Sequence, residues 1–220
     1  TPAAVRGASK ELAPVAGRLL AGSRGGVLLA LVGAAGRVGR AGAMSAEAGT
    51  KGGENDVSTA AGAAIAAAAE AVFSALEKAV DRASALLVLG EKPIATASAS
   101  DVEAAKKLSA VGCALLSSLL SLPSRQAATP YAAALAALPD SAFARVAADG
   151  AGSRAIESLF TGPGLGAKSK KAAGKKLAGK LSFVASTPGG VHAIERAFEA
   201  AGAGGRDAIS AELAAAAKDG

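Results

Sequence analysis

Residues 146–160 read VAADGAGSRAIESLF, and residues 184–198 repeat the pattern as VASTPGGVHAIERAF. Both copies begin with Val-Ala, pass through a corner of small residues and end in Ala-Ile-Glu, with a Phe three positions later. They start 38 positions apart and align without a gap. A period between about 20 and 50 residues is typical of helical repeat proteins. Because Ile156, Leu159 and Phe160 fall at helical spacing, each copy predicts the end of one helix, a glycine corner and a second helix.

The composition favours helices throughout the 220 residues. Hydrophobic residues make up 51%, but aromatic residues only 3%, and there is no Trp. The apolar content is therefore mostly Ala with Leu and Val, and Ala is the best helix former. The aromatic and β-branched residues that strands prefer are scarce. The sequence therefore predicts an all-α protein, built as a solenoid of helical repeats.

The corner and the start of its second helix resemble the Pumilio (PUF) repeat of RNA-binding proteins. In that family a small-residue corner opens the second helix, and the residues after it read one RNA base. GSRAIE at 152–157 matches this pattern closely, and GVHAIE at 190–195 matches it less well. GCALLS at 112–117 and GGV at 25–27 keep the corner but lack the polar readers. The Lys-rich link and the variant repeats are most similar to the divergent nucleolar branch of the family, the nucleolar protein nine type.

The resemblance implies roles for particular side chains. Ser153 and Glu157 are one helical turn apart and would face a base edge, while Arg154 would stack on a base plane. A Ser/Glu pair implies a preference for guanine, whose ring N–H and exocyclic amine a carboxylate can accept. In the next repeat Glu195 keeps its place, and His192 takes the stacking place. The alternative is that Glu157 and Glu195 are surface residues that pair with Arg or Lys.

The repeats suggest a division of the chain into three parts. Residues 1–36 read as a degenerate PUF-like helix pair, and residues 37–100 as an acidic insertion with a long Ala-rich helix. Residues 101–220 read as PUF-like repeats at 101–140, 141–180 and 181–220. Residues 37–58 are rich in Gly, Ala and charged residues and show no periodicity, and within them we expect a flexible loop or linker over residues 49–56. We also expect one or two helices over residues 58–89 and a helix that starts at Thr129-Pro130.

Charge is distributed unevenly along the chain, whose formal net charge is +6. Residues 1–43 carry six basic residues and one acidic one, residues 44–140 seven and ten, and residues 141–220 eleven and seven. Basic ends suit a polyanionic partner. Lys168, Lys171 and Lys175 share one side of a predicted helix, where they could contact RNA phosphates. The alternative is an exposed Lys-rich helix that only aids solubility.

The sequence argues against a catalytic or metal centre. Cys113 and His192 are the only residues of their types, so a Cys- or His-cluster metal site and a Ser-His-Asp triad lack their components. The segment GPGLGAKS at 162–169 ends like a phosphate-binding loop but lacks its spacing, and no apolar strand precedes it. The longest apolar runs are too short for a bilayer. We therefore expect no enzyme activity, cofactor, metal, small-molecule substrate or membrane contact.

The resemblance to the nucleolar branch implies a function. It predicts a non-catalytic protein that binds pre-ribosomal RNA during small-subunit assembly and rRNA processing, in the nucleolus and beside ribosome assembly proteins. The alternative is a helical-repeat scaffold that contacts other proteins in a large ribonucleoprotein assembly. Three of the four candidate repeats lack a full set of base-reading residues, which favours this alternative.

Overall fold

A computed structural model describes the chain apart from residues 23, 48–53, 77–78, 80, 92 and 220. In residues 42–47 and 54–59 it describes the backbone alone. All the elements in the described part are helical: α1 Pro2–Leu12, the 3-10 helix η1 Ala13–Val15, α2 Ala16–Ala21, α3 Gly26–Glu47, α4 Glu54–Ala75, α5 Arg82–Leu87, α6 Ala99–Ala104, α7 Ala110–Leu120, α8 Arg125–Ala137, α9 Asp140–Ala148, α10 Gly152–Thr161, α11 Ala167–Leu177, α12 Leu181–Ala185, α13 Pro188–Ala200 and α14 Ala203–Asp219.

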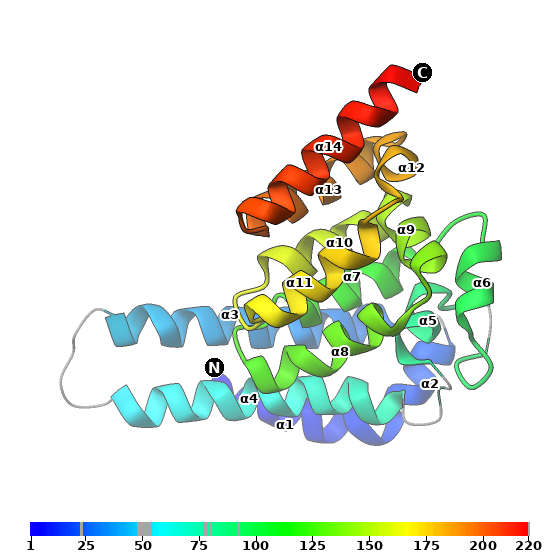
Figure 1. The fold of residues 1–220 in the computed structure, drawn as a ribbon. Helices are drawn as coiled ribbons and strands as arrows, with labels where there is room; N and C mark the ends of the chain where they lie inside the picture. Colours follow the sequence, from blue (N-terminus) through cyan, green and yellow to red (C-terminus); the bar gives the residue numbers. More distant parts are fainter. Residues whose placement is uncertain (23, 48–53, 77–78, 80, 92, 220) are drawn as a thin grey trace.

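The helices form stacked units of three, which is most regular in α9–α10–α11 and α12–α13–α14 (Figure 1). The middle helix α10 packs between α7 and α13, and α7 also contacts α3. We call α3, α7, α10 and α13 the inner row. On the other side α8 packs between α4 and α11, and α14 continues this outer row in Figure 1. The predicted all-α solenoid is confirmed.

A glycine stands where each of the last three middle helices meets the helix before it. A Cβ atom on Gly152 would overlap the carbonyl oxygen of Val146, and one on Gly190 would overlap that of Val184. Gly112 is in the same situation against a carbonyl of α5. Any larger residue at this point would push the two helices apart, so the corner glycine of the sequence repeat has a packing cause.

The residue three positions before each corner glycine caps the middle helix. The hydroxyl of Ser109 accepts a hydrogen bond from the backbone of Gly112, and Thr187 accepts one from Gly190. Thr187 also binds the preceding unit, because its hydroxyl donates to the carbonyl of Ala148 in α9 (2.9 Å). The N–H of Ser109 donates to the carbonyl of Leu87 in α5 (2.8 Å). The Thr187 side chain thus starts a helix and ties its unit to the previous one.

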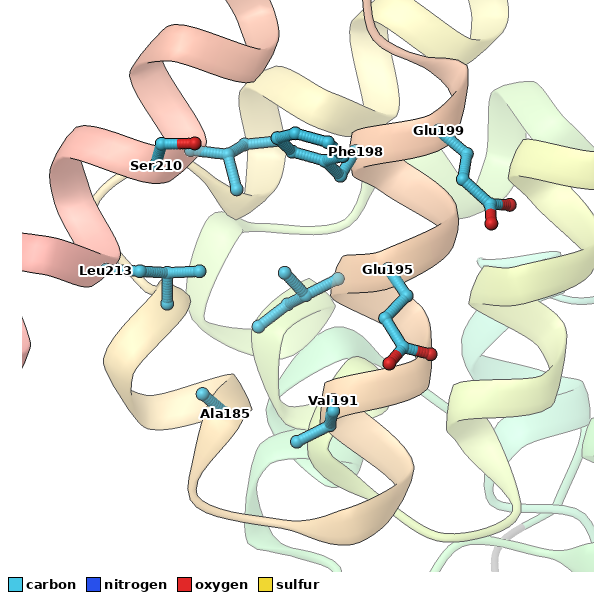
Figure 2. Close-up of a pocket in the computed structure, with 9 residues that line it drawn as sticks. Ala185, Val191, Glu195, Phe198, Glu199, Ser210 and Leu213 are labelled. Carbon is cyan, nitrogen blue, oxygen red and sulfur yellow. The ribbon is translucent and has the colours of Figure 1, made fainter.

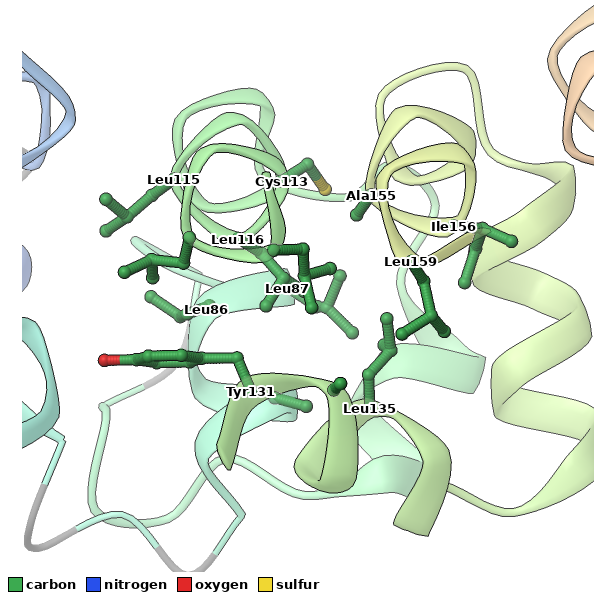
Figure 3. Packing of buried hydrophobic residues seen from close by; sticks show 14 of the residues in the cluster. Leu86, Leu87, Cys113, Leu115, Leu116, Tyr131, Leu135, Ala155, Ile156 and Leu159 are labelled. Atoms are coloured by element: carbon green, nitrogen blue, oxygen red, sulfur yellow. The ribbon is translucent and has the colours of Figure 1, made fainter. Parts of the chain in front are cut away.

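The core lies between the two rows and consists largely of leucine and alanine (Figure 3). Leu116 of α7 and Leu135 of α8 are fully buried there, beside Leu159 of α10. Tyr131 is one of the few aromatic residues of the core, and its hydroxyl donates to the carbonyl of Ala69 in α4 (3.0 Å). The alanines bury little area each, so most of the apolar burial comes from the leucines.

The predicted loop over residues 49–56 is wrong in its described part, because α4 begins at Glu54. The aperiodic stretch before it is helical as well, since α3 continues to Glu47. Residues 48–53 lie outside the described residues. Gly39, at the start of the aperiodic stretch, serves helix packing. A Cβ on Gly39 would come within 2.7 Å of the Pro123 ring and would also meet Ile65 of α4. Composition alone does not separate a glycine that loosens a chain from one that lets two helices meet.

One helix start also differs from the expectation. α8 begins at Arg125, capped by the Ser124 hydroxyl, so Pro130 lies inside the helix. Since Pro130 has no N–H, the carbonyl of Gln126 loses a helical partner, but Gln126 is exposed and water can reach it. For residues 58–89 the sequence predicts one long helix or two. The described part of this segment contains two, α4 and α5.

The predicted division at residues 36 and 100 remains a prediction. α3 crosses residue 36, and α4 packs against α1 and α3, so this part of residues 37–100 contributes to the core. No helix in the described part of the chain has both the length and the apolar character to cross a membrane.

Candidate nucleic-acid interface

Two neighbouring helices of the inner row present polar side chains at matching positions. On α10, Arg154 is exposed and Glu157 is half-buried, two and five positions after the corner glycine. On α13, His192 and Glu195 occupy the same two positions, and both are exposed. Residues three positions apart lie on one side of a helix. Because α10 and α13 are in contact, the four side chains form one polar surface.

Ser153 does not belong to this surface, although the sequence predicted that it would project beside Glu157. It is 2% exposed, and its hydroxyl donates to the carbonyl of Gly150 (3.4 Å). A Cβ on Gly189 would lie 2.8 Å from the Ser153 Oγ atom. The position directly after the corner therefore faces the next unit, and α13 covers it.

The residue directly after the corner glycine is also covered on α7, where a following unit packs against it, and is exposed on α13. Cys113 of α7 is 1% exposed and points toward Ala155 of α10 (Figure 3). Val191 of α13 is 40% exposed. It lies at a groove of about 490 Å³ between α13 and α14, to which Phe198 and Leu213 also contribute (Figure 2). The end of the stack thus presents an apolar face at a position that is covered in the preceding units.

Charge on the polar surface is nearly balanced. His192 Nδ1 lies 3.1 Å from Glu195 Oε2, and Arg196 Nη1 lies 2.7 Å from Glu199 Oε2. The pKa of Arg196 is raised, chiefly by its hydrogen bond to Glu199 and also by the charges of Glu157 and Glu195. Arg196 was not among the predicted site residues, and its position directly after the repeated Ala-Ile-Glu was the only signal for it.

The predicted lysines lie elsewhere. Lys168, Lys171 and Lys175 are exposed on α11, which packs against α8 and α9 in the outer row. They are therefore on the opposite side of the helical stack from Arg154 and Glu157. The structure brings the predicted residues other than Ser153 together in two groups, one on each row.

The first half of the inner row is mostly uncharged where it is exposed. Val27 of α3 is 43% exposed and Val111 of α7 is 38% exposed, and Ala114 follows on α7. Arg37 and Arg40 are exposed further along α3. In its described side chains, this half offers apolar contact and two cations, and lacks a polar pair like the one on α10. Among the described residues no group of three His, Cys, Asp or Glu is arranged to hold a metal ion.

Comparisons with known proteins bear on this geometry. The family model of the NOP9-like PUF repeat domain matches residues 2–219. The fold is similar to APUM23-GGAGUUGACGG, with a TM-score of 0.68 and 23% identity over 93% of this chain and 34% of that one. It is also similar to APUM23-deletion-of-insert-region-GGAAUUGACGG, with a TM-score of 0.68 and 22% identity over 94% of this chain and 36% of that one. A comparison with curated proteins gave no match.

The solved structures are similar to this chain in fold, and the chain spans about a third of their length. The family match covers almost every residue, including both copies of the repeat and the uncharged first half. It agrees with the resemblance carried by the corner glycines and the residues that follow them. The chain belongs to the NOP9-like branch of the PUF repeat family of RNA-binding proteins.

Proposed function

We propose that the chain binds single-stranded RNA along its inner row, with base contacts on α10 and α13 and without catalysis. The observation that carries the proposal is the pairing of Arg154 and Glu157 with His192 and Glu195 at matching positions of two adjacent helices. Repeat proteins of this kind read about one base per unit with two or three side chains. The names of the similar APUM23 structures carry RNA sequences, which supports RNA as the ligand.

The α10 unit would contribute most of the base preference. Arg154 is exposed and has a planar guanidinium group that stacks on a base. Glu157 can accept from the ring N–H and exocyclic amine of guanine. With Ser153 buried, edge contacts in this unit rest on Glu157 alone. In the α13 unit His192 would stack and Glu195 would accept.

The experiment compares the chain with the double variant Arg154→Ala plus Glu157→Ala. Short guanine-containing and guanine-free oligonucleotides are titrated across a salt series. We expect the variant to lose its preference for guanine while the dependence of affinity on salt is largely kept, since that dependence reports phosphate contacts. Arg6→Ala plus Glu11→Ala, which removes an exposed pair from α1, serves as the matched control. Equal guanine preference in all three proteins would refute base reading on α10.

We also propose that the RNA is pre-ribosomal and that the protein acts in small-subunit assembly and rRNA processing, in the nucleolus and beside other assembly proteins. The family match to a NOP9-like domain supports this setting. Crosslinking of the tagged protein to RNA in cells, followed by sequencing, tests it. Enrichment of messenger RNA in place of pre-ribosomal RNA, or a tagged protein that is excluded from the nucleolus, would overturn it.

A second candidate function is that of a protein-binding scaffold. It is favoured by Val27 and Val111, which are exposed on the first half of the inner row, where the described side chains include no base-reading pair. Apolar surface of this kind is common at protein contacts. The scaffold reading predicts that the chain binds an assembly protein through α3 and α7 and shows no measurable affinity for RNA at low salt.

A further inference from the structure

Helix α11 carries a compact positive surface. Its sequence AKSKKAAGKKL holds five lysines and no acidic residue. Lys168, Lys171 and Lys175 are spaced by three and four positions, so they lie on one side of the helix. Ala173 and Leu177, which are buried, lie on the opposite side. The three ammonium groups therefore point away from the core.

These three lysines are not used by the fold. By contrast, Lys176 donates to the carbonyl of Leu138 (2.8 Å) and pairs with Asp140 (2.8 Å). Within the described part of the chain, none of the three makes an ion pair or a side-chain hydrogen bond. Lys168 also stands in the first turn of α11, which has no acidic residue. Cations there are disfavoured by the helix dipole, so the charge lowers the stability of the helix slightly.

Positive charge and base-reading groups are on different sides of the stack. The exposed surface of α10 and α13 has Glu157, Glu195 and Glu199 against Arg154 and Arg196, so it attracts phosphates weakly. Each row is one helix thick, and a helix with its side chains is about 10 Å across, so the two exposed faces are roughly 20 Å apart. The Debye length at physiological salt is about 8 Å. The α11 lysines therefore contribute little attraction to RNA on the inner row.

We propose that Lys168, Lys171 and Lys175 form a second RNA contact on the outer row, which binds the phosphates of an RNA segment other than the one on the inner row. This inference rests on the proposed function, because it assumes that the inner row holds RNA. Lysine suits the task because it offers a mobile point charge and needs no particular base. The protein would thereby hold two RNA segments, one by its bases and one by its backbone.

The test uses the triple variant Lys168→Gln, Lys171→Gln and Lys175→Gln. The inner row is first saturated with a short guanine-containing oligonucleotide, and a fluorescent oligouridine is then titrated across a salt series. We expect wild type to bind oligouridine under these conditions and the triple variant to bind it weakly. Because each phosphate contact with a single strand contributes about 0.7 to the logarithmic salt slope, the slope should fall by about 2.

Two further proteins complete the comparison. Arg6→Gln, Lys10→Gln and Arg18→Gln remove the same number of exposed charges from α1 and α2 and should leave the slope unchanged. Arginine at the three α11 positions keeps the charge and should keep the binding.

Some outcomes contradict the inference. Full competition between guanine oligonucleotide and oligouridine would overturn it while leaving the proposed function intact, and so would equal slopes for wild type and the α11 variant. The inference also fails if the salt slope of the α1 and α2 variant falls as much as that of the α11 variant, because the net charge of the protein would then explain the binding. Absence of RNA binding by every protein would overturn the proposed function itself, and the inference with it.

Discussion

The carboxylate of Asp149 accepts a hydrogen bond from the backbone N–H of Leu108, which stands 41 positions earlier in the chain (3.4 Å). The other oxygen of the same carboxylate accepts from the N–H groups of Ala151 and Gly152, and so starts α10. Arg145 Nη1, from α9, lies 3.5 Å from the oxygen that accepts from Leu108. Asp149 therefore links a helix start, the corner glycine and the preceding unit at one point.

Replacement of Asp149 by Asn should destabilise the fold in a manner that depends on pH. Burial opposes ionisation of Asp149, but the backbone hydrogen bonds and Arg145 outweigh burial and lower its pKa. In the unfolded chain the pKa of an aspartate is about 3.9. Ionised Asp149 therefore stabilises the fold above about pH 4. This stabilisation is lost as the pH falls through the lower pKa that Asp149 has in the folded state. We expect Asp149→Asn to lower the free energy of unfolding by about 1.5–3 kcal/mol at neutral pH.

Urea unfolding at neutral pH and below pH 4 measures this effect. The difference between wild type and Asp149→Asn should shrink on acidification, because protonation removes the same charge from the wild type. Asp140→Asn is a suitable control, because that carboxylate is 61% exposed and its ion pair with Lys176 should contribute at most about 1 kcal/mol. A difference that stays constant with pH would show that the charge of Asp149 is not what stabilises the junction.

Gly152→Ala should destabilise the chain by about 1–3 kcal/mol, because the added methyl group would force α9 and α10 apart. Gly174 in α11 provides the comparison, since a Cβ there meets nothing within 4 Å. Gly174→Ala should stabilise the helix by about 0.5–1 kcal/mol. Thermal or urea unfolding of both variants decides the matter. Equal effects in the two would mean that the corner glycine has no packing role.

The glycine corner and its repetition were predictable because both follow from local sequence. The corner needs a residue without Cβ, and the pattern returns at Gly190 with the same apolar residues around it. The exposed placement of Arg154 and the partly exposed placement of Glu157 were also predictable, since helical spacing fixes their side of α10. These features depend on contacts within one unit or with the unit just before it.

The burial of Ser153 and the extent of α3 were not predictable from the same signals. Ser153 is covered by Gly189, a residue of the following unit, and the length of one repeat does not reveal which side chain the next repeat will cover. In α3 the sequence around Gly39 has the composition of a loop, but that glycine admits Ile65 of α4. Both features arise from contacts between helices that are distant in the sequence.

Ser153→Ala should leave the preference for guanine unchanged. The side chain is buried under α13 and its hydroxyl binds the carbonyl of Gly150, so its loss removes one intramolecular hydrogen bond, which contributes about 1 kcal/mol to stability. Glu157→Ala alone should abolish the preference. Titration of both variants with guanine-containing and guanine-free oligonucleotides distinguishes them. A loss of preference in Ser153→Ala would mean that RNA binding exposes this residue.

Cys113 should resist alkylation in the folded protein. It is 1% exposed, and burial together with the nearby charge of Asp149 raises the pKa of its thiol to about 12. At pH 8 only about one molecule in ten thousand would carry the reactive thiolate, even where reagent could reach it. Because Cys113 is the only cysteine, the incorporation of iodoacetamide, followed by mass spectrometry, reports this one site.

Labelling of Cys113 should therefore follow the opening of the contact between α7 and α10. Its side chain points toward Ala155, so reagent gains access when the two helices separate. If Gly152→Ala weakens this junction, labelling should accelerate about tenfold for each 1.4 kcal/mol of stability lost, provided that reclosure is faster than alkylation. Gly174→Ala should not accelerate it. Labelling of native wild type at the rate seen for the protein unfolded in urea would contradict the packing of Cys113 against α10. It would also contradict the arrangement in which the next unit covers the residue after the corner glycine.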